Sequence, residues 1–249
     1  MANIARALRN LTEWKLQQPA KYPNNSWFWR FLEEYRDAQG RTLEEAELAN
    51  AFEIFQSETE RKKAIAARRW TWSPKSEKEV TYLTTLLEAF FHPDETFTYL
   101  EFGTCFGTTL TRVLGHFKNA CGIGLEINPT RSDVTRWLIS RMDATWNLSQ
   151  RVKLFKGSIV DVSLEPKSVD VVFMDTNHVY PDEFEYITYI LKSNLLRDGF
   201  VFVGDDPLHT GSDTTRRRFI AEQSRNYRII TREDKNLWWF SARQTSSIL

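Results

Sequence analysis

From residue 96 onward, short apolar runs alternate with longer amphipathic stretches, and this alternation predicts an α/β fold. The clearest run, V-D-V-V-F-M at 169–174, is too short for a buried helix and is rich in β-branched residues. We therefore predict a central strand that is covered on both faces. Similar runs predict strands at 96–102, 121–127, 152–155 and 200–203. Strands that alternate with helices in this way form a parallel, doubly wound sheet.

Helices are predicted between these strands, and a different pattern closes the chain. The predicted helices begin at 108 and 130 and span 182–196 and 214–223. Residues 227–231 and 237–241 then form two strands around the turn E-D-K-N, with no helix between them. We expect these two strands to pair as an antiparallel hairpin. The predicted fold class is therefore a Rossmann-like, doubly wound, mainly parallel seven-stranded sheet with a C-terminal antiparallel hairpin.

The first third of the chain lacks such strand-like runs and is predicted to be helical. We divide the chain into a helical extension at 1–75 and a larger α/β domain at 76–249. The sequence T-L-E-E at 42–45 is a capping box, which predicts the start of a longer helix. A second capping box, S-E-K-E at 76–79, predicts the helix that leads into the α/β domain.

Aromatic rings and basic side chains gather in this extension. W-F-W at 27–29 and Phe31 come first, and a run of cations after residue 60 leads into Trp70 and Trp72. Rings beside guanidinium groups can stack on flat substrates or on single-stranded bases. The same rings could instead pack the helices onto the main domain or onto a partner subunit. A lid over the substrate and a homodimer interface are both compatible with this segment.

The composition of the whole chain argues against some classes of partner. Its formal net charge is zero and its pI is near 6.9, so no overall charge indicates a nucleic-acid or membrane surface. No apolar run approaches the length of a membrane span. The first residues lack the apolar region of a secretory signal, and the two cysteines lack metal-site spacing. We expect a cytoplasmic protein that makes no membrane contact.

Acidic residues stand at the ends of the predicted strands, where open α/β sheets bind their ligands. The central strand ends at Asp175, and His178 follows three residues later. A neighbouring strand ends in G-D-D-P, which contains Asp205 and Asp206. Pro207 disfavours the helical region for the residue before it, so we expect both carboxylates in an extended loop. The structural alternative is that Asp175 caps a helix and the two aspartates form a capped turn.

The first two strands also end in candidate binding residues. E-F-G-T-C-F-G at 101–107 has two glycines that let the backbone approach a ligand, just before a helix whose first N–H groups are free. This spacing differs from the G-x-G-x-x-G of dinucleotide sites and favours a ligand that carries an amino acid or a nucleoside. Glu126 ends the second strand, where an acid suits ribose hydroxyls.

These motifs resemble those of the class I S-adenosylmethionine-dependent methyltransferases. Residues 77–245 look most similar to the metal-dependent catechol-type O-methyltransferases and to the macrolide and sugar O-methyltransferases. The resemblance implies a site for S-adenosylmethionine made of Glu101, Gly103, Thr104, Gly107, Glu126, Ile127, Gly157, Ser158 and Asp175. In this implied site, the loop that contains Gly103 and Gly107 surrounds the methionine part of the cofactor. Glu126 holds the ribose of the cofactor, and Ile127 lies beside its adenine. Many members carry an acid near Ser158 that reaches the adenine amino group, and this chain has none there.

The same resemblance implies a site for Mg²⁺ or another divalent cation. Asp175, Asp205 and Asp206 take the places of the family's metal ligands, although the catechol-type enzymes usually carry Asn at the last of them. His178 stands where those enzymes have a lysine base, and some sugar-modifying relatives use a histidine in a D-x-x-H arrangement like this one. The implied catalytic residues are His178 and Asp175. The ordinary pKa of a histidine lies near neutral pH, which suits a general base.

The implied activity is methyl transfer from S-adenosylmethionine to a hydroxyl of a small molecule, such as a diol, a sugar or a natural product. Adjacent oxygens of a diol or a sugar could chelate the metal. One alternative is a nucleic-acid or peptide methyltransferase in which the basic, aromatic extension holds the substrate. Another is a cofactor-binding scaffold without catalysis, which would have no need of the aspartates and the histidine.

Overall fold

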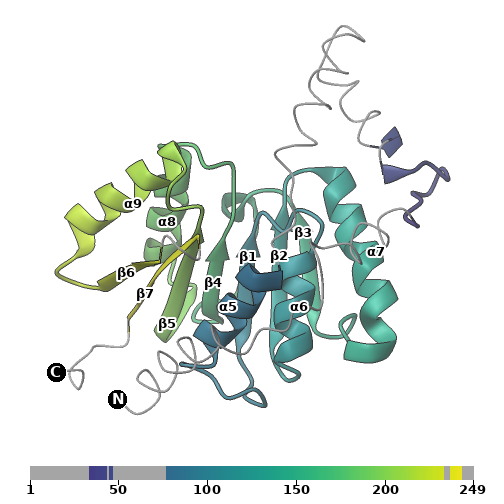
Figure 1. The fold of residues 1–249 in the computed structure, drawn as a ribbon, viewed down its shortest axis with the longest axis horizontal. Coiled ribbons are helices and arrows are strands. Elements are labelled where there is room, and N and C mark those ends of the chain that lie inside the picture. Colours follow the sequence, from purple (N-terminus) through teal and green to yellow (C-terminus); the bar gives the residue numbers. More distant parts are fainter. Residues whose placement is uncertain (1–33, 44, 47–76, 233–235, 243–249) are drawn as a thin grey trace, which may run out of the picture.

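The computed structural model describes residues 34–43, 45–46, 77–232 and 236–242. The described residues from 77 onward form a twisted sheet with helices on both faces (Figure 1). The strands are β1 (Thr98–Phe102), β2 (Cys121–Glu126), β3 (Val152–Lys156), β4 (Val169–Met174), β5 (Leu196–Asp205), β6 (Arg228–Arg232) and β7 (Leu237–Ser241). They lie in the order β3-β2-β1-β4-β5-β7-β6. Neighbours from β3 to β5 pair in parallel, and β7 runs antiparallel to both β5 and β6. The predicted fold class, including the C-terminal hairpin, is confirmed.

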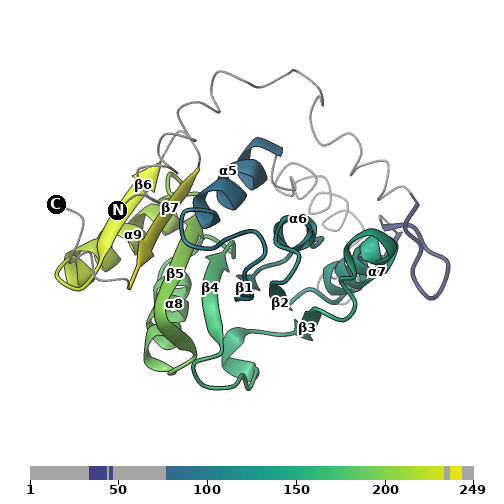
Figure 2. The ribbon, with the colours of Figure 1, turned by 90° about the horizontal axis from the view of Figure 1, so that it is seen from below.

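The helices cover the sheet in two layers because side chains alternate along each strand. The helices are α5 (Glu77–Leu87), α6 (Thr108–His116), α7 (Pro129–Trp146), α8 (Asp182–Lys192) and α9 (Thr210–Gln223), with a 3₁₀ turn, η1, at Ile159–Asp161. In β4, Val171 and Phe173 pack with α5 and α6, whereas Val172 packs with α8 and α9 on the other face. Figure 2 shows α5, α6 and α7 along one face of the sheet. The apolar run of the central strand is thus buried on both sides, as predicted.

Several element boundaries differ from the predicted ones. The helix predicted at 182–196 ends at Lys192, because Asn194 adopts a left-handed conformation (φ 56°). Strand β5 then begins at Leu196, before the predicted start at residue 200. Helix α7 begins at Pro129, and the side chain of Asn128 caps it by accepting a hydrogen bond from the backbone N–H of Arg131.

The described part of the N-terminal extension lies against α7. Tyr35 is buried and contacts Trp137 edge to face, with ring centroids 5.6 Å apart. Glu34 Oε2 lies 2.6 Å from Arg141 on the same helix. The aromatic residues at 27–31 and the cations after residue 60, for which substrate stacking and helix packing were both open, lie outside the described residues, as do Trp70 and Trp72.

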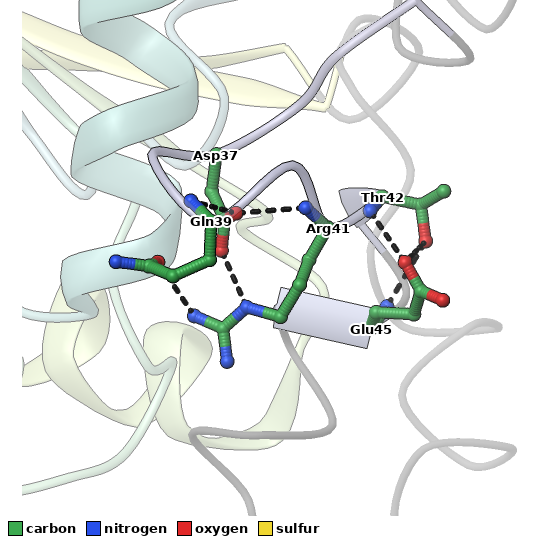
Figure 3. Close-up of polar contacts among 5 residues, drawn as sticks. All are labelled: Asp37, Gln39, Arg41, Thr42 and Glu45. Atoms are coloured by element: carbon green, nitrogen blue, oxygen red, sulfur yellow. Dashed lines mark hydrogen bonds and ion pairs between the residues drawn. The ribbon is translucent and has the colours of Figure 1, made fainter.

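Local hydrogen bonds shape this segment (Figure 3). Asp37 accepts hydrogen bonds from the backbone N–H of Arg41 at 2.8 Å and from its Nε at 2.6 Å. The predicted capping box is present, because Glu45 Oε2 accepts from the Thr42 backbone at 2.7 Å and Thr42 Oγ1 accepts from the Glu45 backbone at 3.3 Å. Most of the predicted helix that follows lies outside the described residues. No helix in the described ranges combines the length and apolarity needed to cross a membrane.

A single guanidinium group ties together the edge of the sheet where the strands begin. Arg151, just before β3, donates to the carbonyls of Ala120 at 2.7 Å and Trp146 at 2.6 Å. It also donates to the carbonyls of Leu114, Phe117 and Asn147. These carbonyls come from the C-terminal ends of α6 and α7 and from the residue before β2, and the last carbonyls of a helix lack an intrahelical partner.

We expect Arg151→Met to lower the free energy of unfolding by about 2 kcal/mol, because it removes charged hydrogen bonds to several helix-end carbonyls while keeping the apolar stem. Urea unfolding followed by circular dichroism measures the change. Arg136→Met is the matched control, since Arg136 is exposed and makes a surface ion pair with Asp133. It should cost less than about 1 kcal/mol. Equal effects of the two substitutions would contradict the role assigned to Arg151.

Candidate functional site

The register of the sheet places three strand ends side by side. Phe102 at the end of β1 pairs with Met174 of β4, and Met174 pairs with Gly204 of β5. Gly103, Asp175 and Asp205 each follow one of these paired residues. The three therefore lie together at the edge of the sheet where the parallel strands end. This is the edge at which open α/β sheets bind ligands.

A pocket of about 440 Å³ opens at this edge. Its lining includes predicted site residues from five strand ends: Gly103, Glu126, Ile127, Gly157, Ser158, Asp175, His178 and Asp206. Residues that the sequence analysis had not assigned to a site also line it: Phe102, Cys105, Leu125, Arg131, Ile159, Thr176, Asn177 and Tyr186. The loops after β1, β2, β3 and β4 thus contribute to one cavity, as predicted for this class of sheet.

Three residues predicted to bind the cofactor lie outside the lining of this pocket. Glu101 is buried within β1, where it accepts a hydrogen bond from the Tyr99 hydroxyl at 2.9 Å. Thr104 is also buried, and Gly107 caps the start of α6 with a φ of 76°. A direct contact with a cofactor stays a prediction for each of these three residues.

Glu126 is firmly positioned in the wall of the pocket. Its carboxylate accepts hydrogen bonds from the backbone N–H of Asn128 at 2.8 Å and of Cys105 at 2.7 Å. Burial raises the pKa of Glu126, while the Asn128 N–H and the charge of Arg131 oppose that rise. The side chain of Ile127, beside it, is 77% exposed and presents an apolar surface to the same pocket. An acid next to an apolar wall is suited to hold a sugar that carries a flat ring.

Gly103 lets two strand ends approach each other closely. It has a φ of 74°, and a Cβ added there would lie 1.8 Å from the carbonyl oxygen of Asp175. No side chain fits in that space, so the residue must be glycine for the loop after β1 to rest on the end of β4.

His178 lies among four acidic side chains. Its Nε2 is 3.5 Å from Asp175 Oδ1 and 3.2 Å from Asp206 Oδ2. On the other side of the ring, Nδ1 is 3.3 Å from Glu183 Oε1 and 3.1 Å from Ser212 Oγ. The fourth acid, Asp205, offers a carboxylate oxygen close to the ring as well.

These carboxylates determine the charge of His178. Burial lowers its pKa, but hydrogen bonds to Asp175 and Glu183 and the charges of Asp175 and Asp206 outweigh burial and raise the pKa to about 10. The expectation that His178 keeps its ordinary pKa is therefore wrong for this arrangement. The ring is a cation at neutral pH, and it partly balances the acids around it. A divalent cation bound to the same acids would lower this pKa by repelling the ring proton.

The residues present fit a divalent cation, in a set that differs from the predicted one. Asp175, His178 and Asp205 each offer one ligand atom, and these atoms lie within 4.8 Å of one another. Among the described residues, Asp206 is outside this group. It adopts a left-handed conformation (φ 45°) in place of the expected extended one, and Asn236 of the hairpin donates a hydrogen bond to its carboxylate. A set rich in carboxylates is typical of Mg²⁺ or Mn²⁺ sites.

Glu183 is missing from the site residues predicted from the sequence, although a signal for it exists. Glu183 lies in the first turn of α8, where acids usually stabilise the helix end from the solvent. It shares a helix face with Ile187 and Ile190, at spacings of four and seven residues, and both are buried. An acid in register with a buried apolar stripe indicates an inward-facing carboxylate.

Known structures share this fold. No protein-family model matches the sequence, and no curated protein matches it. The S-adenosylmethionine-dependent O-methyltransferase from Thermotoga maritima is 16% identical and aligns over 68% of this chain and 66% of its own, with a TM-score of 0.51. The cofactor-bound protein Rv0187 from MTB is 18% identical and aligns over 90% of this chain and 100% of its own, with a TM-score of 0.54. The chain therefore has the fold of S-adenosylmethionine-dependent methyltransferases.

We expect Gly103→Ala to destabilise the protein far more than Gly40→Ala. Both glycines have a φ near 75°, but a Cβ at Gly40 meets nothing within 4 Å. Gly40→Ala should therefore cost only the left-handed backbone term of about 1–2 kcal/mol. Gly103→Ala adds the collision with Asp175 and should cost several kcal/mol or abolish folding. Equal melting temperatures for the two variants would show that the loop does not rest on the end of β4.

The two cysteines should differ in reactivity toward iodoacetamide. Cys121 is exposed, whereas burial raises the pKa of Cys105 to about 12. At pH 7.5 the thiolate of Cys105 is then a minute fraction of the thiol, and the thiolate is the form that reacts. Mass spectrometry of the native protein should find Cys121 alkylated first, with Cys105 labelling faster as the pH rises through 10. Cys105 labelling as fast as Cys121 at pH 7.5 would contradict this.

Proposed function

We propose that this chain is an S-adenosylmethionine-dependent O-methyltransferase that methylates a hydroxyl group of a small molecule with the help of a divalent cation, Mg²⁺ being the first candidate. The observation that carries the proposal is that one pocket joins two kinds of site. One part of its lining has Glu126 and Ile127, which suit a nucleoside. The other part has Asp175 and His178, which together with the neighbouring Asp205 suit a cation and a proton acceptor.

The nucleoside part of the pocket can orient the cofactor. Glu126 is held by two backbone N–H groups, so its carboxylate is pre-positioned to accept hydrogen bonds from ribose hydroxyls. When bound, S-adenosylmethionine supplies a methyl group that is already activated on a sulfonium. The residues of the chain then have to align acceptor and methyl group, and good alignment can remove several kcal/mol of barrier.

The acidic part of the pocket can prepare the acceptor. Asp175 and Asp205 are positioned to hold a cation, which when bound supplies a lower pKa for the acceptor hydroxyl. A bound cation would also lower the pKa of His178, and the neutral ring, which presents Nε2 to the same space, could then take the proton that the hydroxyl loses. An acceptor with neighbouring oxygens, such as a diol or a sugar, suits this arrangement because both oxygens can reach the cation.

The lining of the pocket favours a small acceptor over a nucleic acid. Arg131 is the only lysine or arginine among the described lining residues. A surface that follows a phosphate backbone needs several cations. The basic segment after residue 60 lies outside the described residues, so its roles as a substrate holder, a lid or a dimer interface stay predictions, as does the cytoplasmic location.

We expect separate losses of cofactor and metal binding in two variants. Glu126→Gln should weaken S-adenosylmethionine binding about tenfold or more, because it removes a charged hydrogen-bond acceptor for the ribose. Asp205→Asn should abolish the heat of Mg²⁺ binding and leave cofactor affinity within a few-fold. Isothermal titration calorimetry, with Mg²⁺ and with a chelator, measures both.

Asp198→Asn serves as the control in this experiment, since the Asp198 side chain is 95% exposed and lies at the start of β5, away from the site. It should behave as wild type in both titrations. Absence of S-adenosylmethionine binding to the wild-type chain would overturn the proposed function. Cofactor binding without any Mg²⁺ heat would leave a metal-independent methyltransferase as the interpretation.

A further inference from the structure

We propose that Glu183 is a positioning residue for His178, which fixes the imidazole with its Nδ1–H directed to α8 and its Nε2 directed into the pocket. The catalytic meaning of this inference rests on the proposed function, whereas its geometric content can be tested on the protein alone. The sequence motifs predict no role for Glu183.

The location of Glu183 distinguishes it from its neighbours. The first turn of α8 contains three acids, Asp182, Glu183 and Glu185. Only Glu183 among them is buried, with 2% of its surface exposed, whereas Glu185 faces solvent. All three can stabilise the helix end through its dipole. Burying a carboxylate is costly, so the inward orientation of Glu183 requires a partner that a helix end alone does not supply.

His178 is that partner. Glu183 Oε1 lies 3.3 Å from His178 Nδ1, and it also accepts a hydrogen bond from Thr176 Oγ1 at 3.2 Å. Both residues belong to the loop after β4, so this one carboxylate oxygen holds the loop at two points. Glu183 Oε2 is buried and has no hydrogen-bond partner within the described part of the chain. The stabilisation of the carboxylate therefore comes through Oε1.

The contact determines which nitrogen of the ring keeps its proton when the ring is neutral. An ionised carboxylate only accepts hydrogen bonds, so Nδ1 must be the donor. When the ring is neutral, its lone pair then lies on Nε2. That nitrogen faces Asp175 and Asp206 in the pocket. Without Glu183, the group left near Nδ1 is the Ser212 hydroxyl, which can donate as well as accept. The ring could then exchange tautomers, and the lone pair would point toward α8 for part of the time.

The backbone of His178 is held as firmly as its ring. His178 has a φ of 55°, a conformation that few side-chain-bearing residues adopt. Gly211 of α9 approaches it so closely that an added Cβ would lie 1.8 Å from the His178 carbonyl oxygen. Ser212, the next residue, places Oγ 3.1 Å from Nδ1. Helices α8 and α9 thus hold the loop from both sides, and Glu183 contributes the charged contact.

The test is nuclear magnetic resonance of the full chain labelled with ¹⁵N at its four histidines, with and without Mg²⁺. In the wild type, His178 should show an Nδ1–H proton that is shifted downfield and protected from exchange. In Glu183→Leu this proton should exchange about tenfold faster or disappear, because one charge-assisted hydrogen bond is lost. Glu183→Gln, which keeps a neutral acceptor of the same shape, should restore part of the protection. Glu185→Leu removes a charge from the same helix turn and should change nothing.

Titration with S-adenosylmethionine separates this inference from the proposed function. We expect all these variants to bind the cofactor within about twofold of wild type, since Glu183 lies outside the described pocket lining. A protected Nδ1–H in Glu183→Leu, or a His178 that carries its proton only on Nε2 in the wild type, would overturn the inference even if the cofactor binds. If Glu183→Leu does not fold, the spectrum of Glu183→Gln decides. An Nδ1–H proton of His178 that is as well protected in Glu183→Gln as in the wild type would overturn the assigned ion pair, because glutamine carries no charge.

Discussion

The in-register pairing of three parallel strands is the constraint on which the rest of the molecule depends. Strand β4 lies between β1 and β5, and the paired positions end together at Phe102, Met174 and Gly204. A shift by one residue would turn every inward side chain of β4 to the opposite face and would separate the strand ends. The burial of both faces of β4 therefore fixes the fold and the location of the site together.

Acidic side chains that gather at one edge of the sheet repel one another, and a cationic side chain of the same chain offsets part of this repulsion. Four carboxylates approach His178, and the protonated ring is the counter-charge that the chain itself supplies. Like charges at such distances repel, so the set is stable only when a cation is among them. A ring proton and a metal ion would therefore neutralise the same carboxylates. Whether a metal ion is bound determines whether His178 is protonated.

The elements and most strand ends could be predicted from the sequence because they depend on local patterns. Apolar runs identified the sheet, and acids directly after them identified Glu126, Asp175 and Asp205. The conformation of Asp206 could not be derived in this way, since the hairpin residue Asn236, thirty positions away, holds it. The charge of His178 depends on side chains from α8 and from the loop after β5 as well as from its own loop, so its pKa could be derived only from the assembled site.

Arg151 shows that the two ends of the parallel strands have different roles, one in stability and one in ligand binding. Its guanidinium joins the ends of α6 and α7 at the edge where the strands begin, while the pocket lies at the opposite edge. Substitutions near Arg151 alter how much folded protein a cell maintains, because small losses of stability reduce abundance. At the opposite edge, an exposed lining residue such as Ile127 can change which molecule is bound with little loss of stability, because surface substitutions usually cost little.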